Sequence, residues 1–314
     1  MVYGLGLRFR VMSMNRRSFF RSTTALATAT AGVGLTQRAG AVSIDRSAAD
    51  PAYKIQNSGI KHTLMGWCWK PMDMLVLAKH AKEIGLVGME GIDKKLYPEV
   101  MKLGLGISLV GSHGFAKGPC NPQYKDEVIK ALTESIDVAA DVGCKKVITF
   151  TGMKFDGMDR DEGIKNCLDT WKVVMPHAEK KGITLVLEHL NSRDNTHPMK
   201  GHPGYFVDDV DFCVDLIKQM GSPNFKLLFD IYHVSIMNGD VIRRMHQHKE
   251  YIGHLHTAGN PGRCELDQNQ EINYPAVMQA ALDIGYHDYV AHEFIPTWED
   301  PILALRHACM VCDV

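Results

Sequence analysis

The sequence lacks the features that would point to a nucleic-acid-binding or membrane-spanning protein. It has no basic excess, because 35 lysines and arginines face 36 aspartates and glutamates, which gives a formal net charge of −1. Such a chain has little to offer a phosphate backbone, so general nucleic-acid binding is disfavoured. It also has no uncharged apolar run near the ~20 residues that a membrane span requires. The 45% hydrophobic and 23% charged content is typical of a globular protein.

The motifs of several common enzyme classes are also missing. Neither Gly4-Leu5-Gly6 nor Gly104-Leu105-Gly106 follows a predicted strand, as the glycines of a dinucleotide-binding fold do. There is no phosphate-binding P-loop and no G-x-S-x-G motif. A zinc ribbon needs two C-x-x-C pairs, and the chain has one, formed by Cys309 and Cys312. We expect most of the eight cysteines to be buried as small apolar residues, and a disulfide within that pair stays open.

The N-terminal segment has the three parts of a secretory signal. Asn15-Arg16-Arg17-Ser18-Phe19-Phe20-Arg21 is followed by an uncharged stretch over 22–37 and then by Ala39-Gly40-Ala41. The arginine pair followed by Phe resembles a twin-arginine signal, which implies a periplasmic protein. We expect residues 1–41 to be this signal and residues 42–314 to be the folded domain. The alternative is a basic tail without structure.

Eight short apolar runs alternate with segments of helical periodicity. The runs predict strands over 61–69, 86–92, 107–113, 145–151, 184–191, 225–233, 251–258 and 288–296. Four of the helical segments end at a glycine, namely Gly143, Gly182, Gly221 and Gly285. Strands that are separated by helices cannot pair through tight turns, so they form a parallel sheet. Eight such units in about 250 residues predict an α/β fold, a single (β/α)8 TIM barrel.

Polar side chains interrupt the last four predicted strands at matching depth. Glu188, Asp230 and Glu293 each follow an apolar run, and His254 and His256 lie in the strand over 251–258. Each carboxylate alone could form a salt bridge or cap a turn, but burial is costly unless it is paired or binds a cation. Together they predict a site for one divalent cation, Mn²⁺, Mg²⁺, Co²⁺ or Zn²⁺, at the C-terminal ends of the strands. We expect the two histidines to point to opposite faces, with at most one facing the barrel centre.

The residues around these side chains resemble the metal-site signature of the xylose-isomerase-like barrel superfamily, which includes sugar isomerases and epimerases. The matching segments are Glu188–Asn191, Asp230–His233, Gly253–His256 and His292-Glu293. The segment Ile252–Arg263, with Glu265 and Glu271–Pro275, is similar to hydroxypyruvate isomerases. His256 stands where those isomerases often carry Gln and where epimerases carry His.

The resemblance implies a role for each matching residue. The implied metal ligands are Glu188, Asp230, His256 and Glu293, of which Glu188 and Glu293 would also be catalytic. The implied substrate contacts are His233, Arg263, Glu265, His113 and Asn191. The guanidinium of Arg263 suits a carboxylate or hydroxyl, and Glu265 would orient Arg263 or bind substrate. His233 could instead hydrogen-bond to one of the metal ligands and orient it.

The implied reaction moves a carbonyl by one carbon. A carboxylate takes the proton α to the carbonyl and returns it at the neighbouring carbon, through a metal-bound enediolate. This is the chemistry of a metal-dependent isomerase of the aldose–ketose type, or of an epimerase, acting on a small hydroxy-keto compound or sugar. The expected partner is therefore a small-molecule sugar or keto acid, with no nucleic acid and no membrane span in the mature chain. The oligomeric state stays open, a homo-oligomer included.

Three other interpretations use the same fold. The metal site could perform β-elimination on 3-keto-glycosides, which a periplasmic location favours because glycosides arrive from outside. Endonuclease IV shares the barrel but needs three zincs and a basic groove, which the neutral charge disfavours. A non-catalytic sugar-binding barrel would keep Trp67, Trp69 and Phe115 without needing both glutamates.

Overall fold

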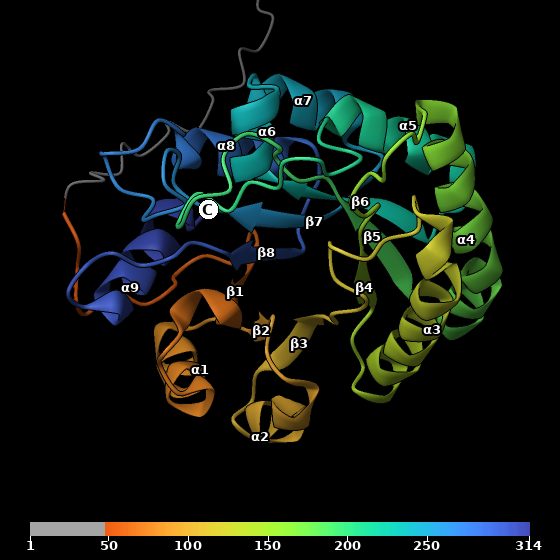
Figure 1. Cartoon of the computed structure of the whole chain (residues 1–314). Coiled ribbons are helices and arrows are strands. Elements are labelled where there is room, and N and C mark those ends of the chain that lie inside the picture. The colour runs from red at the N-terminus through yellow and green to blue at the C-terminus, as the bar shows by residue number, and fades with distance from the viewer. Residues whose placement is uncertain (1–47) are drawn as a thin grey trace, which may run out of the picture. The chain divides into compact units, whose positions relative to one another are not determined.

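Eight parallel strands form one sheet at the centre of the domain (Figure 1). The computed structural model describes residues 48–314, so the predicted signal over 1–41 lies outside the described residues. The strands are β1 (Lys61–Met65), β2 (Gly88–Glu90), β3 (Gly106–Leu109), β4 (Lys146–Thr149), β5 (Thr184–Glu188), β6 (Phe225–Asp230), β7 (Ile252–Thr257) and β8 (Tyr289–His292). Their order, β3-β2-β1-β8-β7-β6-β5-β4, is that of a (β/α)8 barrel and confirms the predicted fold.

Helices surround this sheet (Figure 1). They are α1 (Met74–Ile84), α2 (Tyr97–Lys102), α3 (Lys125–Asp141), α4 (Arg160–Lys181), α5 (Val210–Met220), α6 (Ile231–Met237), α7 (Val241–His248), α8 (Tyr274–Asp283) and α9 (Pro301–Cys312), with short 3-10 turns at η1 (Gly66–Trp69), η2 (Lys94–Leu96) and η3 (Pro122–Tyr124). Asp159 begins α4 by accepting a hydrogen bond from the Glu162 N–H. Gly182 ends α4 with φ +64°, a conformation that favours glycine. Gly221 ends α5 in the same way, and Gly143 and Gly285 follow the last turns of α3 and α8, so the predicted helix ends at glycines are confirmed.

The barrel closes through a weak seam between β3 and β4. Their contact is an isolated bridge between Val110 and Val147, just beyond the end of β3. The N–H of Val110 donates to the carbonyl of Lys146 at 3.0 Å, and the N–H of Ile148 donates to the carbonyl of Val110 at 3.1 Å. Every other neighbouring pair of strands shares a ladder of three or more residue pairs. The seam is therefore the least hydrogen-bonded part of the described barrel wall.

All eight predicted strands exist, but each ends one to four residues earlier than predicted, and after two of them a helix begins at once. Gly66–Trp69 forms η1 instead of extending β1, and α6 begins at Ile231, directly after β6. The side chain of Asp230 accepts a hydrogen bond from the His233 N–H at 3.0 Å and so starts this helix. The apolar run continues across the boundary because both elements are buried, and periodicity cannot separate them. Seven cysteines are buried and all eight are free, so the disulfide left open above is not formed.

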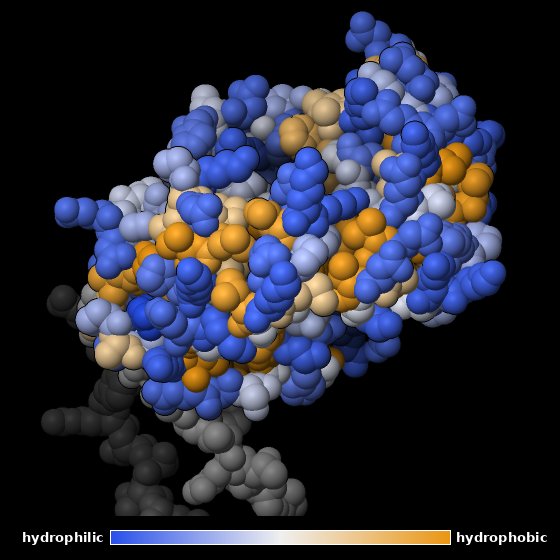
Figure 2. Space-filling model, turned by 90° about the horizontal axis from the view of Figure 1, so that it is seen from below, coloured by the Kyte–Doolittle hydropathy of each residue, from blue (hydrophilic) through white to orange (hydrophobic). Residues whose placement is uncertain are grey.

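The outer surface mixes apolar and hydrophilic side chains. Exposed large apolar residues include Val76 of α1 and Met101 of α2. Figure 2, seen from below the view of Figure 1, shows apolar residues interspersed with hydrophilic ones on this face, as is usual for a globular protein. Between residues 48 and 314, no helix has both the length and the apolar character needed to cross a bilayer.

Candidate metal centre and pocket

Four side chains from neighbouring strands converge at the C-terminal end of the barrel. Glu188 ends β5, Asp230 ends β6, His256 lies in β7 and Glu293 follows β8. Each offers a ligand atom within 4.8 Å of those of the other three, and all four residues are buried. The register of the sheet places Asp230 directly beside His256. The structure thus brings the four predicted residues to one point.

The donor atoms of this cluster fit a divalent cation. Nδ1 of His256 and Oε2 of Glu293 are buried 2.7 Å apart, yet neither forms a hydrogen bond of acceptable geometry with a described residue. The same nitrogen lies 3.7 Å from Oε1 of Glu188 and 3.9 Å from Oδ2 of Asp230. Three carboxylates therefore crowd one imidazole nitrogen away from water. Oxygen donors with one imidazole are the ligand set of Mn²⁺, Mg²⁺, Co²⁺ or Zn²⁺ sites.

Burial and mutual repulsion shift the pKa values of these carboxyl groups. Burial raises the pKa of Asp230 to about 7, and repulsion from Glu293 and Glu188 adds to it, while Arg263 opposes it. Burial likewise raises the pKa of Glu188. For Glu293, attraction to Arg263 and His256 outweighs burial and lowers the pKa to about 2. The cluster therefore holds one firmly ionised carboxylate beside two that are costly to ionise without an added cation.

The two histidines of β7 point to the same face, so the expectation of opposite faces is wrong. Nε2 of His254 lies 3.0 Å from Glu90, and Nε2 of His256 lies 2.8 Å from it. Side chains alternate between the two faces of a strand, so residues two apart, such as His254 and His256, point to the same face. Glu90, fully buried in β2, was missed in the sequence. It interrupts the apolar run over 86–92 in the same way as Glu188 interrupts its own run.

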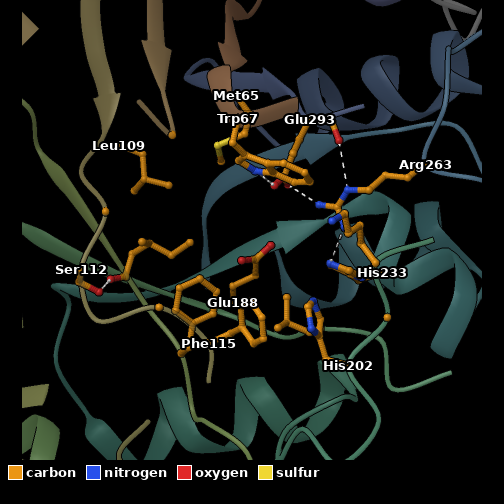
Figure 3. A pocket seen from close by; sticks show the side chains of 18 of the residues that line it. Met65, Trp67, Leu109, Ser112, Phe115, Glu188, His202, His233, Arg263 and Glu293 are labelled. Carbon is orange, nitrogen blue, oxygen red and sulfur yellow. Dashed lines mark hydrogen bonds and ion pairs between the residues drawn. The ribbon is translucent and has the colours of Figure 1, made fainter. Parts of the chain in front are cut away.

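A cavity of about 640 Å³ lies over the cluster. Its walls are mostly apolar and aromatic, and four of its polar residues lie in or beside the cluster, as Figure 3 shows for Glu188, His233, Arg263 and Glu293. Trp67 lines the cavity and donates a hydrogen bond from Nε1 to Oε1 of Glu293 at 3.0 Å. The shape and composition are those of a small-molecule pocket.

Arg263 and His233 form one wall of this pocket (Figure 3). Nη2 of Arg263 lies 2.8 Å from Oε2 of Glu293, and Nη1 lies 3.3 Å from Nε2 of His233. Arg263 has φ +51°, which is uncommon outside glycine and is often found at functional sites. Asn191 does not line the cavity; its side-chain nitrogen lies 2.8 Å from Nδ1 of His233 and so orients that ring.

Two other predicted substrate contacts lie outside the pocket wall. Glu265 accepts hydrogen bonds from the N–H groups of Thr297 and Trp298, so it fixes the loop after β8 and does not orient Arg263 as expected. His113 has both ring nitrogens engaged, with Nδ1 2.9 Å from the carbonyl of Lys117 and Nε2 3.0 Å from the hydroxyl of Thr149. Neighbours in the sequence of a loop need not face the same cavity, and the substrate contacts that the resemblance implies for these two residues stay predictions.

The fold and site define a (β/α)8 barrel with a carboxylate-rich centre at the C-terminal ends of its strands. Residues 80–309 match the model of the xylose isomerase-like TIM barrel family, and the chain belongs to this family.

Its relatives in sequence include isomerases. The 2-oxo-tetronate isomerase of Cupriavidus necator is 29% identical over 165 residues, which cover 52% of this chain and 60% of that protein. The hydroxypyruvate isomerase of Escherichia coli is 27% identical over 215 residues, covering 66% and 79%. The matched region thus spans less than two thirds of the first relative. The structure of a 3-keto-D-glucoside 4-epimerase from E. coli superposes with a TM-score of 0.67 at 20% identity, covering 79% of this chain and 97% of that one, which shows a shared fold.

Proposed function

We propose that the protein is a divalent-metal-dependent isomerase or epimerase that acts on a small hydroxy-keto compound by removing its α-proton. The observation that carries the proposal is the convergence of Glu188, Asp230, His256 and Glu293 at one buried point beneath a pocket. The isomerases among the relatives support it. Such an enzyme is an intramolecular oxidoreductase when it moves the carbonyl, and an epimerase when it inverts a carbon.

These four side chains would hold the cation, which when bound stabilises the negative charge that develops on the substrate oxygens as the proton leaves. Glu188 is the stronger base, because burial raises its pKa and its Oε1 lies as far as 3.7 Å from Nδ1 of His256. Glu293 is restrained by Trp67 and Arg263. We assign proton removal to Glu188, which returns the proton to the adjacent carbon in an isomerase. In an epimerase Glu188 would keep the proton that it removes, and another proton would return from the side of Glu293, which must first take one up because Arg263 and His256 hold it ionised.

The remaining pocket residues orient the substrate and exclude water. Arg263 and His233 present N–H groups beside the carboxylates, where substrate hydroxyl or carboxylate oxygens would lie. The apolar walls, with Trp67 and Phe115, lower the local dielectric, so each charge interaction is stronger than in water.

A second candidate reaction is β-elimination from a 3-keto-glycoside. It begins with the same proton removal and then expels the aglycone. The size of the cavity, about 640 Å³, favours it, because sites of this volume hold ligands much larger than a three-carbon keto acid.

The reaction is tested by deuterium exchange. The full chain loaded with Mg²⁺ is incubated in deuterated water with hydroxypyruvate, a ketohexose or a 3-keto-glycoside, and NMR follows deuterium at the α-carbon. We expect exchange that is lost in chelator-treated protein and in Glu188→Gln. Release of an aglycone would establish elimination. Absence of exchange with every compound, in protein shown to bind the metal, would contradict the proposal.

We also propose export by the twin-arginine pathway, which would leave residues 42–314 in the periplasm. The proposal rests on Arg16, Arg17 and the apolar stretch after them, since the segment lies outside the described residues. Fractionation of cells that express the chain should find it in the periplasm. Replacing both arginines by lysine should keep it in the cytoplasm, and unchanged export of that variant would refute the assignment.

A further inference from the structure

Lys200 brings a positive charge into the pocket that lacks an acidic partner. It lines the cavity with Trp67 and Arg263, and its Nζ lies 5.5 Å from the centre of the Trp67 ring. Within residues 48–314 its ammonium forms no ion pair with a carboxylate. Arg263, by contrast, is paired with Glu293 at 2.8 Å and with Asp230 at 3.7 Å. Lys200 is thus the cation of the pocket wall that is free to meet a ligand.

The loop between β5 and α5 holds Lys200 in this position. The N–H of Lys200 donates to the carbonyl of Thr196 at 3.2 Å, and its φ is +55°, a conformation that non-glycine residues rarely adopt. The next residue, Gly201, packs so closely that a Cβ there would lie 2.4 Å from Oδ1 of Asn191. A strained residue in a tightly packed loop is typical of functional sites.

The formal charges of the catalytic cluster balance without Lys200. Glu188, Asp230 and Glu293 contribute three negative charges, and a divalent cation with Arg263 contributes three positive ones. Lys200 therefore leaves the loaded pocket with one positive charge in excess.

The charged residues in the barrel interior beneath the cluster do not neutralise this excess positive charge. The buried carboxylate of Glu90 lies in the barrel interior, where Lys146 supplies a positive charge. Nζ of Lys146 also lies 2.8 Å from Asp288, whose other oxygen is 3.3 Å from Nζ of Lys61. Two carboxylates thus face two ammonium groups in this region, which is neutral as a whole.

We propose that Lys200 binds the carboxylate of the substrate, so that the pocket selects hydroxy-keto acids over neutral sugars. This rests on the proposed function, since the carboxylate cluster would hold the hydroxy-ketone end of the same molecule. A single excess positive charge matches a carboxylate monoanion, whereas a phosphate dianion would over-neutralise it. An ammonium among apolar walls attracts such a group more strongly than one in water.

The test compares charged and neutral ligands that cannot react. Ligand-observed NMR titrations of the Mg²⁺-loaded full chain with D-glycerate and with glycerol give binding without turnover. Lys200→Met keeps the length of the side chain and removes its charge, Lys200→Arg restores the charge, and Lys130→Met on the exposed surface of α3 is the matched control. We expect Lys200→Met to weaken glycerate binding about ten- to hundredfold and glycerol binding less than twofold. Lys200→Arg should recover most of the loss.

Turnover separates this inference from the proposed reaction. With hydroxypyruvate, Lys200→Met should raise KM by a similar factor with little change in kcat, whereas with dihydroxyacetone, which replaces the carboxylate by a neutral CH2OH group, KM should not change. Equal weakening of glycerate and glycerol would overturn the inference, as would efficient turnover of ketohexoses that is indifferent to Lys200→Met, while the isomerase function stood. Lys200-dependent glycerate binding in a protein that exchanges no α-proton would uphold the anion site and refute the reaction.

Discussion

Oε1 of Glu90 lies 2.8 Å from Nε2 of His256, while the other nitrogen of that ring faces Glu188, Asp230 and Glu293. A carboxylate that accepts the Nε2 proton leaves the Nδ1 lone pair free for a cation and fixes the plane of the ring. Burial alone would raise the pKa of Glu90, but attraction to His254 and His256 outweighs burial and holds that pKa below its usual range. Glu90 is thus a positioning residue for the candidate metal ligand.

Replacing Glu90 by Gln should weaken metal binding about ten- to hundredfold, because the amide orients the imidazole less strongly. Calorimetric titration with Mn²⁺ measures this directly. Glu127→Gln removes an exposed carboxylate that pairs with Lys117 at 3.0 Å and should leave the affinity unchanged. Equal affinity of the Glu90→Gln variant and the native protein would show that the contact does not support metal binding.

Replacing Glu188 or Glu293 by Gln should leave a folded protein with turnover reduced by about a thousandfold or more, because each variant loses a cation ligand and a proton-transfer group. The measurement is α-proton exchange at saturating Mg²⁺, with circular dichroism to verify the fold. Normal turnover of both variants would rule out their assignment as the catalytic pair.

Adding a divalent cation to chelator-treated protein should raise the unfolding temperature, because the cation relieves repulsion among buried carboxylates. At a concentration a hundred times the dissociation constant, linkage predicts a gain of about 2.7 kcal/mol. Asp230→Asn should reduce the gain by weakening the site. A thermal shift of equal size in that variant would mean that the ion binds elsewhere.

Stability should fall between about pH 6.5 and pH 4 in part through His189. Burial lowers the pKa of this histidine to about 3, and neither ring nitrogen forms a hydrogen bond within the described residues. Since the unfolded chain takes up the proton near pH 6.5 and the folded one does not, acid favours unfolding by up to about 1.4 kcal/mol per pH unit. Urea unfolding of metal-free His189→Leu should show a shallower pH slope by this amount. Leu185→Ala, in the strand β5 that ends just before His189, should lower stability with the slope unchanged.

The cluster of candidate metal ligands could be predicted because carboxylates inside apolar strand ends are conspicuous in a sequence. Glu90 carries the same signal, but β2 has only three residues and its partner His256 is distant in the chain. Lys200 could not be predicted, since its place over the pocket depends on the path of a loop that has no periodicity. The change from strand to helix at Ile231 could not be predicted either, because both elements are buried and apolar there.

The sparse junction between β3 and β4 has a consequence for the range of ligands that the pocket can accommodate. Leu109 and Ile148, from either side of that junction, line the cavity. Because one backbone bridge at Val110 and the side chains of Ser112 and His113 are the hydrogen-bonded links between the two edges within the described residues, this flank can shift more easily than the ladders that carry Glu188, Asp230 and His256. Adaptability for bulkier ligands is thereby confined to the flank of the barrel that bears none of the candidate metal ligands.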